Sequence, residues 1–151
     1  MDLGNIKKLL VVEIALLFIQ FGLGMFANLF VDIPLNAPFN FFGYTDGLLI
    51  LAHIVNGSLI LFFGFTIIWF SYKAKDLLIR ILPVLSVVLT IIAITCGIVF
   101  LEIFSFPSLY NNDNYFSLAM AMSFLCVFTV LFSELYASKK AQKSKIEEET
   151  S

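Results

Sequence analysis

The apolar run from Leu48 to Tyr72, LLILAHIVNGSLILFFGFTIIWFSY, decides the fold. It exceeds the roughly 20 residues that an α-helix needs to cross the hydrocarbon core of a bilayer. It also contains His53, the single histidine of the 151-residue chain. An ionisable side chain inside a membrane helix costs free energy, so it marks a candidate functional site. The run therefore predicts a membrane-spanning helix with a functional polar group inside it.

The composition extends this prediction to the rest of the chain. Hydrophobic residues make up 60% of the sequence and charged residues 13%, well below the roughly 25% charged residues of soluble domains. Mean hydropathy is +0.98. We predict an all-α integral membrane bundle of four transmembrane helices, followed by a polar tail that is frayed or disordered. The helices are expected at about 9–31, 48–72, 81–104 and 115–136, and the tail at 137–151.

Basic residues predict the orientation of the bundle. All nine Lys and Arg residues fall in the N-terminal head, in the loop between the second and third predicted helices, or in the tail. The positive-inside rule then places both termini in the cytoplasm of a multi-pass cell-membrane protein. The net charge is only −2, and the basic residues are spread over the membrane flanks, so we expect no nucleic-acid partner.

Small and polar residues recur on one face of each predicted helix, where they favour close helix packing and interhelical hydrogen bonds. Pro83 is expected in the first turn of the third helix, where a missing amide hydrogen is tolerated. The faces predicted to point inward carry Glu13, Gln20, Gly24 and Ala27; His53, Asn56, Gly57, Ile60 and Gly64; Ser86, Thr90, Ala93 and Gly97; and Ala119, Met122, Ser123, Cys126 and Ser133.

Besides His53, five polar residues of the bundle are candidate site positions. One of them, Glu102, is expected close to a helix end, where its carboxylate reaches headgroup water. Asn28 is expected near the outer end of the first helix. The five positions are Glu13, Gln20, Asn28, Asn56 and Glu102.

Few kinds of chemistry fit these residues. A structural zinc site needs several converging His or Cys ligands, and we expect no metal site from one His, Cys96 and Cys126. The two cysteines are expected to be packing residues. We expect no catalytic residues, because no nucleophile stands beside a base in a recognisable spacing. Haem is the one cofactor that the pattern permits, with His53 and Met122 as an axial pair at similar depth.

The order of the parts resembles the four-helix unit of the heme A synthase family. The resemblance lies in GLGMFANLFVDIP, which ends the first helix, and in LLILAHIVNGSL, which opens the second. It implies haem bound near the outer face by histidines of the second and fourth helices. Only His53 carries over, since Ile50 and Ile54 replace the family's acidic residue and arginine, and the fourth helix has no histidine. The stretch from Gly24 to Pro34 also looks like small prokaryotic membrane proteins without an assigned activity.

Three functions are compatible with these patterns. The first is a non-enzymatic subunit or accessory of a respiratory or haem-handling membrane assembly, with other membrane subunits or further copies of itself as partners alongside the lipid bilayer. The second is a haem-binding protein of the heme A synthase type, with His53 as an axial ligand. The third is a proton or small-solute transporter, which would use Glu13 and Gln20 in the inner half and His53 and Asn56 in the outer half.

Overall fold

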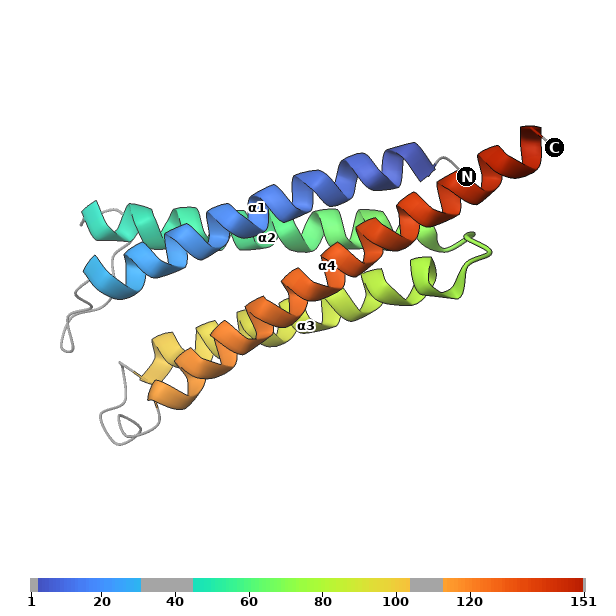
Figure 1. The fold of residues 1–151 in the computed structure, drawn as a ribbon. Coiled ribbons are helices and arrows are strands. Elements are labelled where there is room, and N and C mark those ends of the chain that lie inside the picture. The colour runs from blue at the N-terminus through green and yellow to red at the C-terminus, as the bar shows by residue number, and fades with distance from the viewer. Residues whose placement is uncertain (1–2, 31–44, 104–112, 151) are drawn as a thin grey trace.

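The structure is a bundle of four helices (Figure 1). It is a computed structural model that describes residues 3–30, 45–103 and 113–150. All four helices are long and apolar enough to cross a membrane. This confirms the prediction of an all-α bundle with four helices of membrane-spanning length. The helices are α1 (Leu3–Phe30), α2 (Thr45–Ser71), α3 (Leu77–Ile103) and α4 (Asp113–Thr150).

Successive helices run up and down, and α4 closes the bundle by packing against both α3 and α1 (Figure 1). The most extensive packing joins α3 to α4, followed by α1 to α2. Both chain ends lie at the same end of the bundle, together with the turn between α2 and α3 (Figure 1). We call this the terminal end, and the opposite end the far end.

A side-chain cap sets the start of α3. The Leu78 backbone amide donates a hydrogen bond of 2.8 Å to Asp76 Oδ1, which is the arrangement of a helix N-cap. The helix therefore begins at Leu77, earlier than the sequence indicates. As a result Pro83 lies inside the helix rather than in its first turn, so that prediction was wrong. Its ring nitrogen offers no hydrogen for the Ile79 carbonyl.

The last helix is longer than the sequence predicts, because α4 continues through the polar tail to Thr150. Ala, Lys, Gln and Glu have high helix propensity, and extending an existing helix needs no new nucleus. The start of the tail also packs, since Ala137 and Ser138 are buried. Lys7 Nζ of α1 donates a hydrogen bond of 2.7 Å to Gln142 Oε1. The tail is therefore helical where the sequence predicted a frayed terminus.

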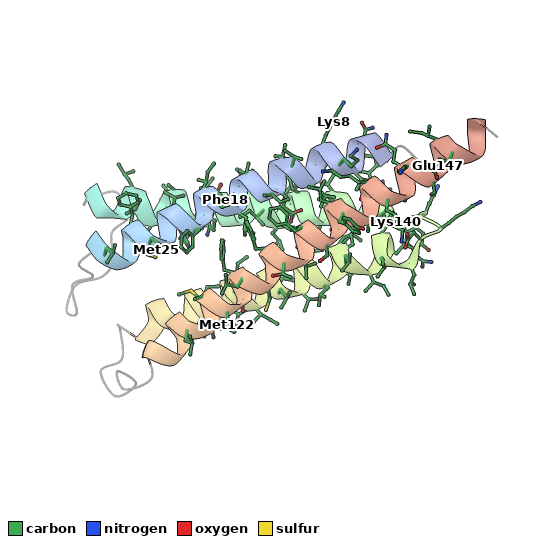
Figure 2. All side chains as sticks on the ribbon, viewed as in Figure 1. Lys8, Phe18, Met25, Met122, Lys140 and Glu147 are labelled. Atoms are coloured by element: carbon green, nitrogen blue, oxygen red, sulfur yellow. The ribbon has the colours of Figure 1, made fainter. Side chains whose placement is uncertain are left out.

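The outside of the bundle is apolar over most of its length. Among the labelled side chains of Figure 2, Phe18, Met25 and Met122 lie along the middle and the far end. Lys8 and Lys140 lie at the terminal end (Figure 2). Exposed apolar area on this scale is unfavourable in water and is the surface that a lipid bilayer covers.

Candidate functional site

A network of three polar side chains joins α1 and α2 in the half of the bundle toward the far end. Asn56 Nδ2 donates hydrogen bonds to the Leu16 carbonyl at 2.9 Å and to Gln20 Oε1 at 2.8 Å. Gln20 Nε2 lies 3.0 Å from His53 Nε2. The predicted hydrogen bonding of Asn56 between helices is confirmed, and the structure brings Gln20, His53 and Asn56 together.

The hydrogen bonds of this network determine which ring nitrogen of a neutral His53 carries the hydrogen. Gln20 Oε1 accepts from Asn56, so Gln20 Nε2 is the amide group that faces His53 and donates to its Nε2. In a neutral imidazole the other nitrogen then carries the hydrogen. That nitrogen, His53 Nδ1, is buried and has no hydrogen-bond partner among the described residues. The network therefore ends in one unused donor.

Two glycines let the helices approach closely enough for these bonds. A Cβ atom built on Gly24 would lie 3.2 Å from His53 Cε1, and one on Gly57 would lie 3.2 Å from Gln20 Nε2. Both distances are shorter than ordinary van der Waals contact between heavy atoms. The small-residue faces predicted for α1 and α2 therefore do face each other.

The structure does not bring the predicted haem ligands together in the bundle interior. Met122 is 54% exposed and lies on the outside of α4 near the far end (Figure 2). The Nε2 lone pair of His53, which would bind iron, accepts the hydrogen bond from Gln20. Ligation through that atom requires the Gln20 bond to break. Haem binding by His53 stays a prediction from the sequence.

A second polar cluster lies toward the terminal end and is built around Glu13 of α1. The side chain of Glu13 is 1% exposed. A Cβ atom built on Gly64 of α2 would lie 3.3 Å from Glu13 Oε1 and 2.7 Å from Val87 Cγ2 of α3. Because Gly64 has no side chain, α2 leaves room for both neighbours. The predicted inward position of Glu13 is confirmed.

Glu134 of α4 lies at the height of Glu13 in the bundle, and α4 packs against α1. Two contacts set the register of these helices: the Phe18 and Phe128 rings are 4.9 Å apart, and Lys7 bonds to Gln142. Residues 13 and 134 lie between these two contacts and at matching height. Glu134 is 0% exposed, so both carboxyls are buried at this height of the bundle.

Most oxygens of this carboxyl pair have no hydrogen-bond partner. Within the described part of the chain, Glu13 Oε2 and both oxygens of Glu134 are buried and unbonded, as are the hydroxyls of Ser86 and Ser138. Ser138 follows Glu134 by about one turn, on the same face of α4. A buried carboxylate without a partner is costly. Two facing carboxyls lower this cost by sharing a proton, in which one O–H donates to an oxygen of the other.

An apolar layer separates the two polar clusters. On α1, Leu17 lies between Glu13 and Gln20, and on α2, Ile60 lies between Asn56 and Gly64. Both apolar side chains are buried, at 4% and 2% exposure. The network at His53 and the carboxyl pair are therefore two separate sites, not one continuous polar line.

Glu134 is the residue that the sequence analysis missed, and the interior face predicted for α4 was largely wrong. Met122, Cys126 and Ser133 are exposed, and of the predicted positions only Ser123 is buried. Ser133 Oγ bonds to the Thr129 carbonyl within its own helix at 2.8 Å, so its hydroxyl needs no interior partner.

A signal for Glu134 was present in the sequence. This residue lies two helical turns after Val127 and three after Ser123, at 3.6 residues per turn. These two residues are buried with it. A carboxylate inside an apolar run and on the face of a small polar residue is a candidate interior group.

Of the remaining predicted positions, four are half-buried: Ala27, Ala93, Gly97 and Ala119. Ser86 and Thr90 of α3 are buried as expected. The side chains of Asn28 and Glu102 lie outside the described part of the chain. Over the residues that the structure describes, no group of three His, Cys, Asp or Glu side chains could hold a metal ion.

Comparisons with protein-family models, curated proteins and solved structures find no match for this chain. The resemblance to the heme A synthase family therefore stays a prediction from the residues that suggested it.

Proposed function

We propose that the chain is a non-enzymatic integral membrane subunit that takes up and releases a proton at Glu13 and Glu134, as part of a larger membrane assembly. The observation that carries this proposal is the burial of both carboxyls on facing helices, with three of their four oxygens unbonded in the described part of the chain. Ionisable groups inside membrane bundles typically belong to proton or ion pathways.

The membrane location is supported by four helices of spanning length and by the aromatic residues of the terminal end. Trp69, Tyr72 and Tyr136 are strongly exposed, with Trp69 at 81%. Aromatic side chains of this kind favour the membrane interface. Lys73 follows Tyr72 directly, and Lys139 follows Tyr136 by three residues. The excess of Lys and Arg at this end supports placing it, and both termini, in the cytoplasm.

The chemistry required of the pair is uptake of one proton. In the occupied state, a protonated carboxyl of one glutamate donates a hydrogen bond to the other, which leaves a single negative charge on the pair. Loss of that proton would leave two like charges facing each other in a medium of low dielectric. Release of the proton therefore requires that water, a cation or a partner group reaches the carboxyl pair. A component outside the bundle can control this release.

A subunit role fits this geometry better than a self-contained transporter. A proton path through one bundle needs donors and acceptors in hydrogen-bond sequence or ordered water between them. Leu17 and Ile60 interrupt that sequence between the two polar clusters. We propose that protons reach and leave the carboxyl pair from the terminal end and are exchanged with another component of the assembly.

Labelling with an apolar carbodiimide, which reacts with protonated carboxyls in membranes, tests the proton site. We expect an adduct on Glu13 or Glu134 in the reconstituted protein, and its loss in the double variant Glu13→Gln/Glu134→Gln. Glu147→Gln is the matched control, since the Glu147 carboxylate is exposed and pairs with Lys143 at 3.7 Å. The control variant should be labelled like the wild type.

Two outcomes would overturn the proton site. Absence of any adduct on the folded wild-type protein would show that neither carboxyl holds a proton. Protection from labelling by sodium, at constant pH, would show that the pair holds a metal cation instead. Purification from the native membrane in mild detergent tests the subunit role. Co-purifying membrane proteins are expected, whereas sustained proton flux by the chain alone in liposomes would contradict it.

A further inference from the structure

A groove on the bundle surface lies where α2 ends and α3 begins. It has a volume of about 250 Å³ and is lined by Ile68, Tyr72, Leu77, Arg80, Ile81 and Val84. Four of these six side chains are aliphatic. The two polar groups, the Tyr72 hydroxyl and the Arg80 guanidinium, belong to the terminal end of the bundle. The groove therefore combines an apolar length with a cationic end.

The charges around the groove complement an anion. Lys73 and Lys75 lie in the turn that joins the two helices, so this turn adds two positive charges at the same end of the bundle as Arg80. The nearby acidic residue is Asp76, and its carboxylate already caps α3 through Leu78. In the described part of the chain, Arg80 forms no ion pair. Its guanidinium is free to bind a phosphate with two parallel hydrogen bonds.

The position of the groove favours a lipid over a soluble anion. Its walls belong to the surface that the bilayer would cover, and Trp69, which follows the lining residue Ile68 in the sequence, is exposed. Basic pockets between membrane helices on the cytoplasmic side bind anionic lipid headgroups. The aliphatic walls suit the upper part of one acyl chain, and inorganic phosphate would leave them unused.

We propose that this groove binds one anionic phospholipid. Its phosphate lies between Arg80 and Tyr72, and its acyl chain runs along Ile81 and Val84 toward the bilayer centre. This site is separate from the carboxyl pair, and it holds whether or not that pair binds a proton.

Native mass spectrometry in mild detergent tests the groove. The purified protein is titrated with phosphatidylglycerol or with phosphatidylcholine of the same acyl chains, and the population carrying one lipid is measured. We expect phosphatidylglycerol to bind more tightly. Arg80→Gln should weaken phosphatidylglycerol binding about fivefold, since one basic residue near the surface contributes roughly that factor. It should weaken phosphatidylcholine binding by less, because the choline cation offsets the charge of the phosphate. Lys8→Gln removes an exposed charge of the same end from α1 and should have no effect.

A second pair of variants tests the apolar walls. Val84→Phe places a ring in the groove and should lower binding of both lipids. Val11→Phe places the same ring on an exposed position of α1, which does not line the groove, and should leave binding unchanged. Equal binding of the two lipids by the wild type, or unchanged phosphatidylglycerol binding in Arg80→Gln, would overturn the proposal. Equal effects of Val84→Phe and Val11→Phe would overturn it as well.

Discussion

Substitution of Gly64 by alanine tests how the helices around Glu13 fit together. The added Cβ would lie 2.7 Å from Val87 Cγ2 and 3.3 Å from Glu13 Oε1. Unbonded carbon atoms prefer separations of about 3.5–4.0 Å, so α2 or Val87 must move by about 1 Å. Valine in a helix has one strongly preferred rotamer, so the helices themselves have to separate.

The expected cost follows from two opposing contributions. Overpacking of this kind destabilises by about 1–3 kcal/mol. Alanine is favoured over glycine inside a helix by about 0.5–1 kcal/mol. Gly64→Ala should therefore range from nearly neutral to about 2.5 kcal/mol destabilising. At Gly22 no described atom lies within 4 Å of an added Cβ. Gly22→Ala should therefore stabilise by about 0.5–1 kcal/mol, and the difference between the two variants isolates the packing contribution.

A double-mutant cycle with Val87→Ala makes the test specific. Val87→Ala alone should cost about 2 kcal/mol through lost burial and a cavity. In Gly64→Ala/Val87→Ala the new methyl group occupies the vacated space, so the coupling energy should be about 1–3 kcal/mol in the favourable direction. The assay is unfolding in mixed detergent micelles, followed by far-ultraviolet circular dichroism. Additive effects of the two changes would refute the packing of Gly64 against Val87.

Four further predictions follow from the two polar clusters and the chain topology. Glu13→Leu/Glu134→Leu should raise the free energy of unfolding by about 1–4 kcal/mol, because it replaces both buried carboxyls by apolar side chains, while removing the carbodiimide adduct; a loss of stability on detergent unfolding would contradict the cost of burying the two carboxyls. Gln20→Leu should destabilise by about 1–3 kcal/mol, because it leaves buried partners unbonded, and an unchanged unfolding midpoint would argue against the network. A reporter fused after Ser151 should read cytoplasmic, and an extracytoplasmic signal would reverse the orientation. If the protein binds haem, His53→Ala should abolish the Soret band, and purification of the wild type without such a band removes that reading.

The helices themselves could be predicted from the sequence because bilayer thickness imposes a length that apolar runs reveal directly. Their ends were harder to place. The start of α3 depends on the side chain of Asp76, and the extension of α4 depends on packing of Ala137 and Ser138. Neither the cap nor this packing can be recognised from the hydropathy of the sequence.

The two polar clusters show where periodicity is informative. The inward faces of α1 and α2 could be predicted, since Gln20, Asn56 and Gly57 interrupt an apolar background. The inward face of α4 could not be read in the same way, because small residues such as Ser133 satisfy their hydroxyls within the helix. Glu134 became a candidate because the α1–α4 register brings it to the height of Glu13, and this register is not a property of either helix alone.

Infrared spectroscopy of the reconstituted protein is the most direct test of a proton held by the carboxyl pair. A protonated carboxylic acid has a carbonyl stretching band that is separate from the bands of carboxylates and of the backbone. A proton held by the pair predicts this band near neutral pH in the wild type and in Glu147→Gln, and its loss in Glu13→Gln/Glu134→Gln. A wild-type spectrum without the band, or a band that persists in the double variant, would contradict it.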